Sequence, residues 1–217
     1  MTVHSLPLAV VDERARRTWS GRLQMALILL VCAAPVVASY LAVYVIRPSA
    51  GESAYGELIQ PSVGLPDAAG TDLQGRSVPL RSLKGQWLLV VVGASTCDAA
   101  CEQRLFLQRQ LREMLGRERE RVDKVWLVTD DAPLPPALQQ AVTSGVPVQV
   151  LRLPKADVQA WLRPASGRAL EEHLYVVDPM GEWMMRVPLA PDPAKVKRDL
   201  DRLLRASAAW DTPGRER

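Results

Sequence analysis

Residues 87–110 read WLLVVVGASTCDAACEQRLFLQRQ, and this stretch decides the fold. Its first part is a short, unbroken, β-branched apolar run between Gly85 and Gly93. Such a run is typical of a strand that is buried on both faces in the centre of an α/β sheet. From Ala99 onward the stretch lacks Gly and Pro and is rich in Leu, Gln, Arg and Glu, which predicts a helix. The sequence therefore predicts a central strand that is followed at once by a helix.

Two cysteines, Cys97 and Cys101, lie where this strand is followed by the helix. The carboxyl ends of strands are where open α/β sheets build their sites. Positions i and i+4 share one face of a helix, so the two thiols could form a disulfide or hold one soft metal ion. The positive end of the helix favours the thiolate form of a thiol in the first turn. The alternative is a pair that only fills the core, and the polar residues Ser95, Thr96 and Asp98 argue against it.

Composition excludes some classes of function. The net charge is +3 over 217 residues, and charged side chains do not gather in blocks of one sign, so we expect no nucleic-acid partner. The length suits one domain. Of the three cysteines, Cys32 lies in the most apolar segment of the chain, which leaves Cys97 and Cys101 as the only pair elsewhere.

The most apolar segment runs from Leu23 to Ile46 without a charged residue. It exceeds the roughly 20 residues that a helix needs to cross a bilayer. Four arginines precede it within residues 14–22 and only Arg47 follows closely, so the positive-inside rule predicts a cytoplasmic N-terminus and an exported domain. A cleaved signal peptide is the alternative, and the length of the segment and Tyr40 and Tyr44 near its end argue against it.

The part of the chain after residue 65 shows short alternating strands and helices. A hairpin is expected at 72–80 before the central strand, further strands at 125–129, 147–153, 173–177 and 183–187, and helices at 137–144, 157–162 and 193–204. The turn sequence Asp178 to Gly181 predicts that the last two strands are antiparallel. This order of elements, with two cysteines after the central strand, is a thioredoxin-like α/β architecture.

We therefore divide the chain into five parts. They are a cytoplasmic tail (1–22), a transmembrane helix (23–46), a juxtamembrane linker (47–64), a thioredoxin-like domain (65–206) and a disordered tail (207–217). The linker is predicted from its Gly, Ser, Glu and Pro content. The expected location is a bacterial inner membrane, crossed once, with the main domain in the periplasm.

Residues 85–101, GQWLLVVVGASTCDAAC, resemble the core motif of the Sco/SenC family. The later segment 175–181, YVVDPMG, is similar to the D-P-x-G strand of that family, and residues 72–85 resemble its first hairpin. The resemblance covers about residues 65–204. It implies a membrane-tethered protein of thioredoxin fold that assists cytochrome c oxidase assembly. Such proteins bind copper through two Cys and one His, or they reduce the cysteines of the oxidase copper site.

The resemblance implies a metal site of Cys97, Cys101 and one distant His. His173 is the candidate because it is the only His outside the N-terminal tail. The family position of this ligand falls near Leu170, so His173 serves only if the loop is shorter or the register shifts. Otherwise it is a strand histidine beside a neighbouring acidic side chain.

Two other copper sites stay open. The thioethers of Met180, Met184 and Met185 are soft ligands that Cu(I) accepts, although methionines next to a tryptophan more often fill a core. Alternatively, the two thiolates alone could hold Cu(I).

Copper binding and delivery through Cys97 and Cys101 is the expected function, with an oxidase subunit or another copper-site assembly factor as the partner. One alternative is a thiol–disulfide oxidoreductase, in which one cysteine attacks a partner disulfide and the other resolves the mixed disulfide. The other is a non-catalytic docking protein whose cysteine pair is a structural disulfide.

Overall fold

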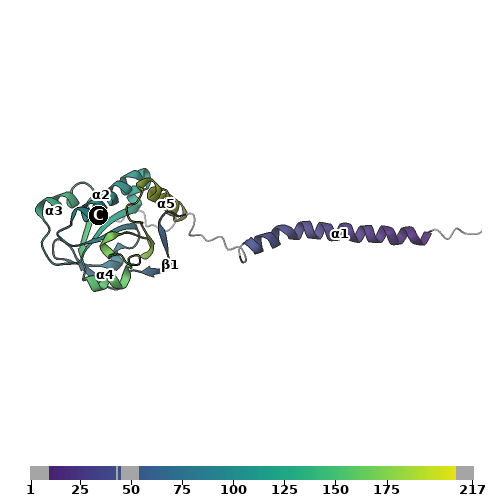
Figure 1. The fold of residues 1–217 in the computed structure, drawn as a ribbon, viewed down its shortest axis with the longest axis horizontal. Coiled ribbons are helices and arrows are strands. Elements are labelled where there is room, and N and C mark those ends of the chain that lie inside the picture. The colour runs from purple at the N-terminus through teal and green to yellow at the C-terminus, as the bar shows by residue number, and fades with distance from the viewer. Residues whose placement is uncertain (1–9, 43, 45–53, 209–217) are drawn as a thin grey trace, which may run out of the picture. The chain divides into compact units, whose positions relative to one another are not determined.

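The computed structural model describes residues 10–42, 44 and 54–208, with side chains from residue 21 onward. The chain forms two units, residues 1–50 and 51–217, and each is described by itself (Figure 1).

Helix α1 (Val10–Leu41) makes up most of the first unit. Within it, the 21 residues Gly21–Leu41 are long and apolar enough to cross a membrane by length and composition, and none of their side chains is buried. This exposure argues against a core helix and supports a single membrane-spanning segment. The helix begins inside the predicted tail (1–22), while residues 43, 45 and 46 of the predicted span (23–46) lie outside the described residues. The orientation of the segment stays a prediction.

The second unit is built on one eight-stranded sheet with the strand order β1-β8-β7-β4-β5-β6-β2-β3. The strands are β1 (Glu57–Gly64), β2 (Ala69–Thr71), β3 (Ser77–Pro79), β4 (Trp87–Gly93), β5 (Val122–Val128), β6 (Gln149–Arg152), β7 (Leu174–Val177) and β8 (Glu182–Arg186). The helices are α2 (Ala99–Met114), α3 (Pro136–Thr143), α4 (Lys155–Trp161) and α5 (Pro193–Ala206), with short 3-10 turns η3 (Leu80–Leu83), η4 (Gly116–Arg121) and η5 (Leu170–Glu172). Every residue of β4 is buried, as the apolar run predicted.

Strand directions decide which residues meet at each edge of the sheet. β4, β5 and β6 are parallel, whereas β7 is antiparallel to β4 and β8 is antiparallel to β7. The end of β4 and the start of β7 therefore lie at the same edge, and the turn between β7 and β8 lies at the opposite edge. The predicted hairpin is present as β2 and β3, and the antiparallel last pair is confirmed.

The two faces of the sheet carry separate cores. Alternate residues of β4, Leu89 and Val91, belong to the core under α2, α3 and α5. Leu88, Val90 and Val92 belong to the core under α4. Figure 1 shows α2, α3 and α5 along one side of the sheet and α4 along the other. The α/β class predicted from the sequence is confirmed.

Two boundaries differ from the predicted ones. Residues 57–64 were predicted as linker but form β1, which pairs with β8. The Asp199 carboxylate accepts hydrogen bonds from the backbone N–H groups of Tyr55 (2.7 Å) and Gly56 (2.8 Å), and it thereby fixes the start of this strand. Ser207 was predicted in the disordered tail, yet it is buried and its hydroxyl accepts a hydrogen bond from Trp87 Nε1 (3.0 Å). Residues 209–217 of that tail lie outside the described residues.

Candidate functional site

The loop after β4 is fixed to the loop after β5. The Thr129 N–H donates to the Gly93 carbonyl (3.1 Å), and the Ser95 N–H donates to Asp130 Oδ2 (3.0 Å). Burial alone would raise the pKa of the Asp130 carboxyl, but hydrogen bonding by Ser95 and by the Ala132 N–H, together with the charge of Arg152, outweighs burial and lowers that pKa. Asp130 is therefore an ionised anchor for the segment that leads to the cysteines.

The cysteine pair begins helix α2. Asp98 is the N-cap of this helix, and its carboxylate accepts a hydrogen bond from the Cys101 N–H (2.8 Å). Cys97, the residue before the cap, has a φ of 40°, in the left-handed region that L residues rarely adopt. Its N–H donates to the Ala94 carbonyl (3.1 Å), which closes a tight turn from the strand into the helix. Backbone strain of this kind is concentrated at functional sites.

Cys97 and Cys101 form a disulfide with a Cα–Cα distance of 5.1 Å. The predicted proximity of the two thiols is therefore observed. Both residues are buried, with 5% and 3% of their surface exposed, and both belong to the core under α2. Cys97 lies on the tight turn before the helix, whereas Cys101 lies in its first turn with its N–H bound to the Asp98 cap.

Trp126 and Cys101 both lie beside Gly93. A Cβ atom placed on Gly93 would lie 3.2 Å from Cys101 Sγ and 3.4 Å from Trp126 Nε1. The indole is fully buried, and its N–H has no hydrogen-bond partner among the described residues. The absence of a side chain at Gly93 thus leaves room beside that residue for both Cys101 and an indole N–H, which can only donate.

His173 lies at the same sheet edge as the cysteines but on the other face. It directly precedes Leu174, which packs in the core with the cysteines, while its ring packs edge to face on Tyr175 in the opposite core, with centroids 6.0 Å apart. His173 Nε2 accepts a hydrogen bond from the Ala165 N–H (3.2 Å), and only 2% of the residue is exposed. Burial lowers the pKa of the imidazole.

The structure therefore does not bring the three predicted ligands together. Within residues 54–208 and the described part of the helix, no group of three or more His, Cys, Asp and Glu side chains is arranged to hold a metal ion. Of the three predicted ligands, only Cys97 and Cys101 lie together, as a disulfide. The partner of His173 is a backbone N–H, not the acidic side chain that was the alternative prediction.

The methionines lie elsewhere. Met180 is in the turn between β7 and β8, where the Gly85 N–H donates to the Pro179 carbonyl (2.8 Å) beside the start of β4. Because the cysteines follow the end of β4, Met180 belongs to the opposite edge of the sheet. Met185 is buried against the backbone at Gly56, and Met184 packs at the border of the same core.

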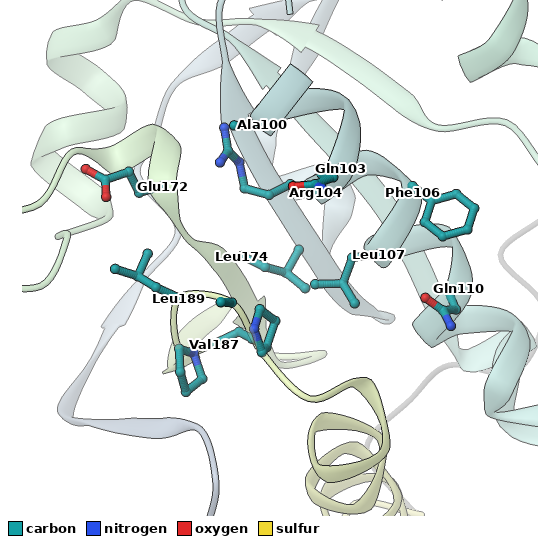
Figure 2. A pocket seen from close by; sticks show the side chains of 13 residues that line it. Ala100, Gln103, Arg104, Phe106, Leu107, Gln110, Glu172, Leu174, Val187 and Leu189 are labelled. Atoms are coloured by element: carbon teal, nitrogen blue, oxygen red, sulfur yellow. The ribbon is translucent and has the colours of Figure 1, made fainter. Parts of the chain in front are cut away.

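A cavity of about 630 Å³ lies beside α2, between that helix and the segment 187–191 (Figure 2). Its walls are formed by Ala100, Gln103, Arg104, Phe106, Leu107, Gln110, Glu172, Leu174, Val187, Pro188, Leu189, Ala190 and Pro191. Figure 2 shows the side chains of Leu107 and Leu174 facing each other, with the guanidinium of Arg104 directed toward the end marked by Ala100 and Glu172. Ala100, which precedes Cys101 in the first turn of α2, lines one end of the cavity, and neither Cys97 nor Cys101 is among the residues of its walls.

Arg104 is the cation of this cavity. It lies three residues after Cys101, so the two are neighbours on the helix surface. Its Nε is buried without a hydrogen-bond partner among the described residues. Burial lowers the pKa of the guanidinium, while the charges of Asp98, Glu172 and Glu171 act in the opposite direction.

Sequence reasoning missed Arg104, Asp130 and Trp126. Helical spacing was a usable signal for Arg104, because i and i+3 are adjacent on a helix. For Asp130 the signal was its place directly after a buried strand, at the carboxyl edge of the sheet where sites are built. No sequence pattern marks Trp126, whose indole comes to lie beside Gly93 only in the folded sheet.

These features define a thioredoxin-like domain with a cysteine pair at the start of the helix that follows the central strand. Residues 87–207, more than half of the chain, match the family described as transmembrane-like, thioredoxin-like, C-terminal domain. The chain belongs to this family. Among the curated proteins none matches the chain.

Solved structures of Sco proteins have the same fold. The apo Sco1 protein of Thermus thermophilus is 20% identical with a TM-score of 0.55, and the match covers 70% of this chain and 97% of that one. Yeast Sco1 is 17% identical with a TM-score of 0.54, covering 68% and 97%. A SCO1/SenC family lipoprotein of Bacillus anthracis is 18% identical with a TM-score of 0.50, covering 67% and 98%. The resemblance to Sco/SenC proteins is thus confirmed at the level of the thioredoxin-like fold.

Proposed function

We propose that this chain is a membrane-anchored thiol–disulfide exchange protein that reduces the cysteines of a cytochrome c oxidase copper site. The observation that carries the proposal is the Cys97–Cys101 disulfide at the start of α2, which needs no third side chain for its chemistry. The positive end of the helix stabilises a thiolate there, as thiol exchange requires.

The exchange proceeds in two balanced steps. In the reduced protein, the Cys97 thiolate attacks one sulfur of the partner disulfide, so a mixed disulfide forms and the other partner sulfur leaves as a thiolate. The Cys101 thiolate then attacks Cys97 Sγ, which restores the internal disulfide and releases the second partner thiol. Two electrons pass from this protein to its partner, and an external dithiol donor returns the pair to its reduced form.

The partner and the location rest on the sequence. The motifs of residues 85–101 and 175–181 resemble those of proteins that serve the oxidase copper site, which makes an oxidase subunit or another assembly factor the expected partner. The arginines before the apolar helix support a cytoplasmic N-terminus and a periplasmic domain at a bacterial inner membrane.

Copper carriage is the second candidate, and the adjacency of the two sulfurs favours it. After reduction, Cys97 and Cys101 would present two soft thiolates to one Cu(I) ion. Titration of the reduced full-length protein with Cu(I) against a chelator tests this. Tight one-to-one binding that His173→Ala leaves unchanged supports a two-sulfur carrier, whereas binding that is lost with the substitution supports the three-ligand site.

The exchange function is tested on full-length protein in detergent, with Cys32→Ser to remove the third thiol. Reduced protein is mixed with glutathione disulfide, and the Cys101→Ser variant serves to trap the intermediate. We expect rapid formation of the internal disulfide in the parent protein and a stable mixed disulfide on Cys97 in the variant. A disulfide that resists dithiothreitol would leave only the docking function, whereas a reduced pair that does not react with glutathione disulfide would exclude exchange and leave copper carriage or docking.

A further inference from the structure

We propose that the cavity beside α2 holds the segment of the partner that carries the reacting sulfur, and that Arg104 binds a carboxylate in that segment. The occupant is an extended stretch of a partner protein with an acidic residue, or a chain end, close to its cysteine. This inference rests on the proposed exchange function and names the chemistry of the partner.

The position of the cavity supports this role. One wall is α2 itself, from Ala100 next to Cys101 through Leu107, and the other is the segment after β8. A chain lying there would pass within one helical turn of the disulfide. Its volume of about 630 Å³ lies within the range of established binding pockets, about 300–1,000 Å³.

The walls fit a chain with apolar side chains. Leu107, Leu174 and Val187 line the cavity, and Leu189 and Pro191 close it on the side of the loop before α5. Such walls would take up one or two apolar side chains of a partner, while a polar group at the end fixes its register.

The charge of Arg104 supplies that polar group. Its buried Nε has no hydrogen-bond partner among the described residues, and the nearby carboxylates of Asp98, Glu171 and Glu172 act on the guanidinium through their charges. The acid that shares the cavity, Glu172, is engaged elsewhere: its carboxylate accepts from the Ala169 N–H (2.9 Å) and pairs with Arg168 (3.5 Å). A half-buried cation with an unsatisfied N–H is suited to a carboxylate brought in by a ligand.

The other side of α2 provides the matched control. Arg109 lines a second cavity of about 410 Å³ between α2 and α3 and is exposed to solvent. Its charge is therefore screened by water, while Arg104 is half-buried. Replacing either arginine removes one positive charge from the same helix. A difference in reactivity between the two variants is therefore due to the position of Arg104 beside the cavity and not to the change in net charge.

The test compares glutathione, which has two carboxylates, with glutathione dimethyl ester, which has none. Rate constants for reduction of the Cys97–Cys101 disulfide are measured with both thiols in full-length Cys32→Ser protein and in its Arg104→Gln, Arg104→Lys and Arg109→Gln variants. The quantity compared is the rate constant for glutathione divided by that for its dimethyl ester, both at equal thiolate concentration. The ester shows whether each variant keeps a reactive disulfide.

We expect Arg104→Gln to lower the ratio by about tenfold, which corresponds to about 1.4 kcal/mol, the scale of a hydrogen bond to a charged group. Arg104→Lys should retain part of the preference, and Arg109→Gln should retain all of it. An unchanged ratio in Arg104→Gln, or an equal loss in Arg109→Gln, would overturn the inference while leaving the exchange function intact. Failure of both thiols to reduce the parent protein would overturn both.

Discussion

Two regions at the same edge of the sheet are built in opposite ways. One is the cysteine loop, and the other is the histidine corner, which consists of His173 with its neighbours Ala165 and Tyr175. In the cysteine loop, residues 94–98, Cys97 lies on a turn with an unfavourable φ, and three of the residues around it (Ala94, Thr96 and Asp98) are exposed. In the histidine corner, the ring of His173 is enclosed between Tyr175 and the Ala165 N–H on the other face. The first arrangement favours reaction, and the second favours stability.

Because of this difference, the cysteines and His173 have separate roles, although the resemblance to Sco/SenC proteins groups them into one metal site. Alternation along β7 sends Leu174 to the face of the cysteines and Tyr175 to the other face. His173 shares the face of Tyr175, so a strand position that looks suitable for a ligand becomes a core position. Three sets of substitutions and one change of pH distinguish the two regions, in order of decreasing effect.

The strongest effect is expected in the cysteine loop. Cys101→Ser should abolish turnover with glutathione disulfide, because the mixed disulfide on Cys97 can no longer be resolved within the chain. His173→Ala should keep the rate within about twofold, because the imidazole takes no part in the exchange. Stopped-flow assays of the reduced proteins check both variants. Equal losses in the two would remove the distinction between the regions.

The histidine corner should instead carry stability. His173→Ala removes the acceptor of the Ala165 N–H and leaves a gap beside Tyr175, so the free energy of unfolding should fall by about 1–3 kcal/mol. Denaturant unfolding of the full-length protein measures this value. His173→Gln, which keeps an acceptor, is the control and should lose less. An unchanged unfolding midpoint in His173→Ala would show that the ring does not support the fold.

A smaller effect is expected beside Gly93. Trp126→Phe keeps most of the buried ring but removes the unpartnered N–H that, like the Cys101 sulfur, lies beside Gly93. If this N–H stabilises the thiolate, the variant should raise the pKa of the Cys101 thiol and slow the resolving step about threefold, the effect of one net neutral hydrogen bond. The pH profile of thiol alkylation checks the pKa. A profile identical to that of the parent would exclude the hydrogen bond.

The weakest effect is a dependence of stability on pH. Burial lowers the pKa of His173 in the folded chain, while the unfolded value is near about 6.5. Above that pH both states are neutral at this ring, and as pH drops below it the unfolded state takes up the proton first, so stability falls. The melting temperature should therefore decrease between about pH 7 and pH 5, and less so in His173→Gln. Equal slopes in both proteins would assign the decrease to other groups.

The sequence was informative wherever one local pattern determines the structure. The buried run from Trp87, the hairpin before it and the turn at Asp178 each predicted the element that is observed. The cysteine pair was predicted for the same reason, since a strand end followed by a helix start places residues 97 and 101 together.

Features that depend on distant contacts could not be predicted in the same way. Residues 57–64 have the composition of a linker and become a strand because β8 and Asp199 provide partners far along the chain. The face to which His173 turns depends on the register of β7 against β4, which a single sequence does not contain. The cavity at Arg104 likewise exists only because residues 187–191 return to α2.

A site built from two cysteines alone is tested most directly by the midpoint potential of the Cys97–Cys101 pair in the full-length protein, with and without His173→Ala. Equilibration in glutathione buffers, followed by thiol trapping, gives both values. We expect a reversible two-electron couple whose midpoint the substitution leaves in place, because the imidazole belongs to the other core. A shift of more than about 30 mV, or about 1.4 kcal/mol, would show that His173 is coupled to the sulfurs and would contradict a two-cysteine site.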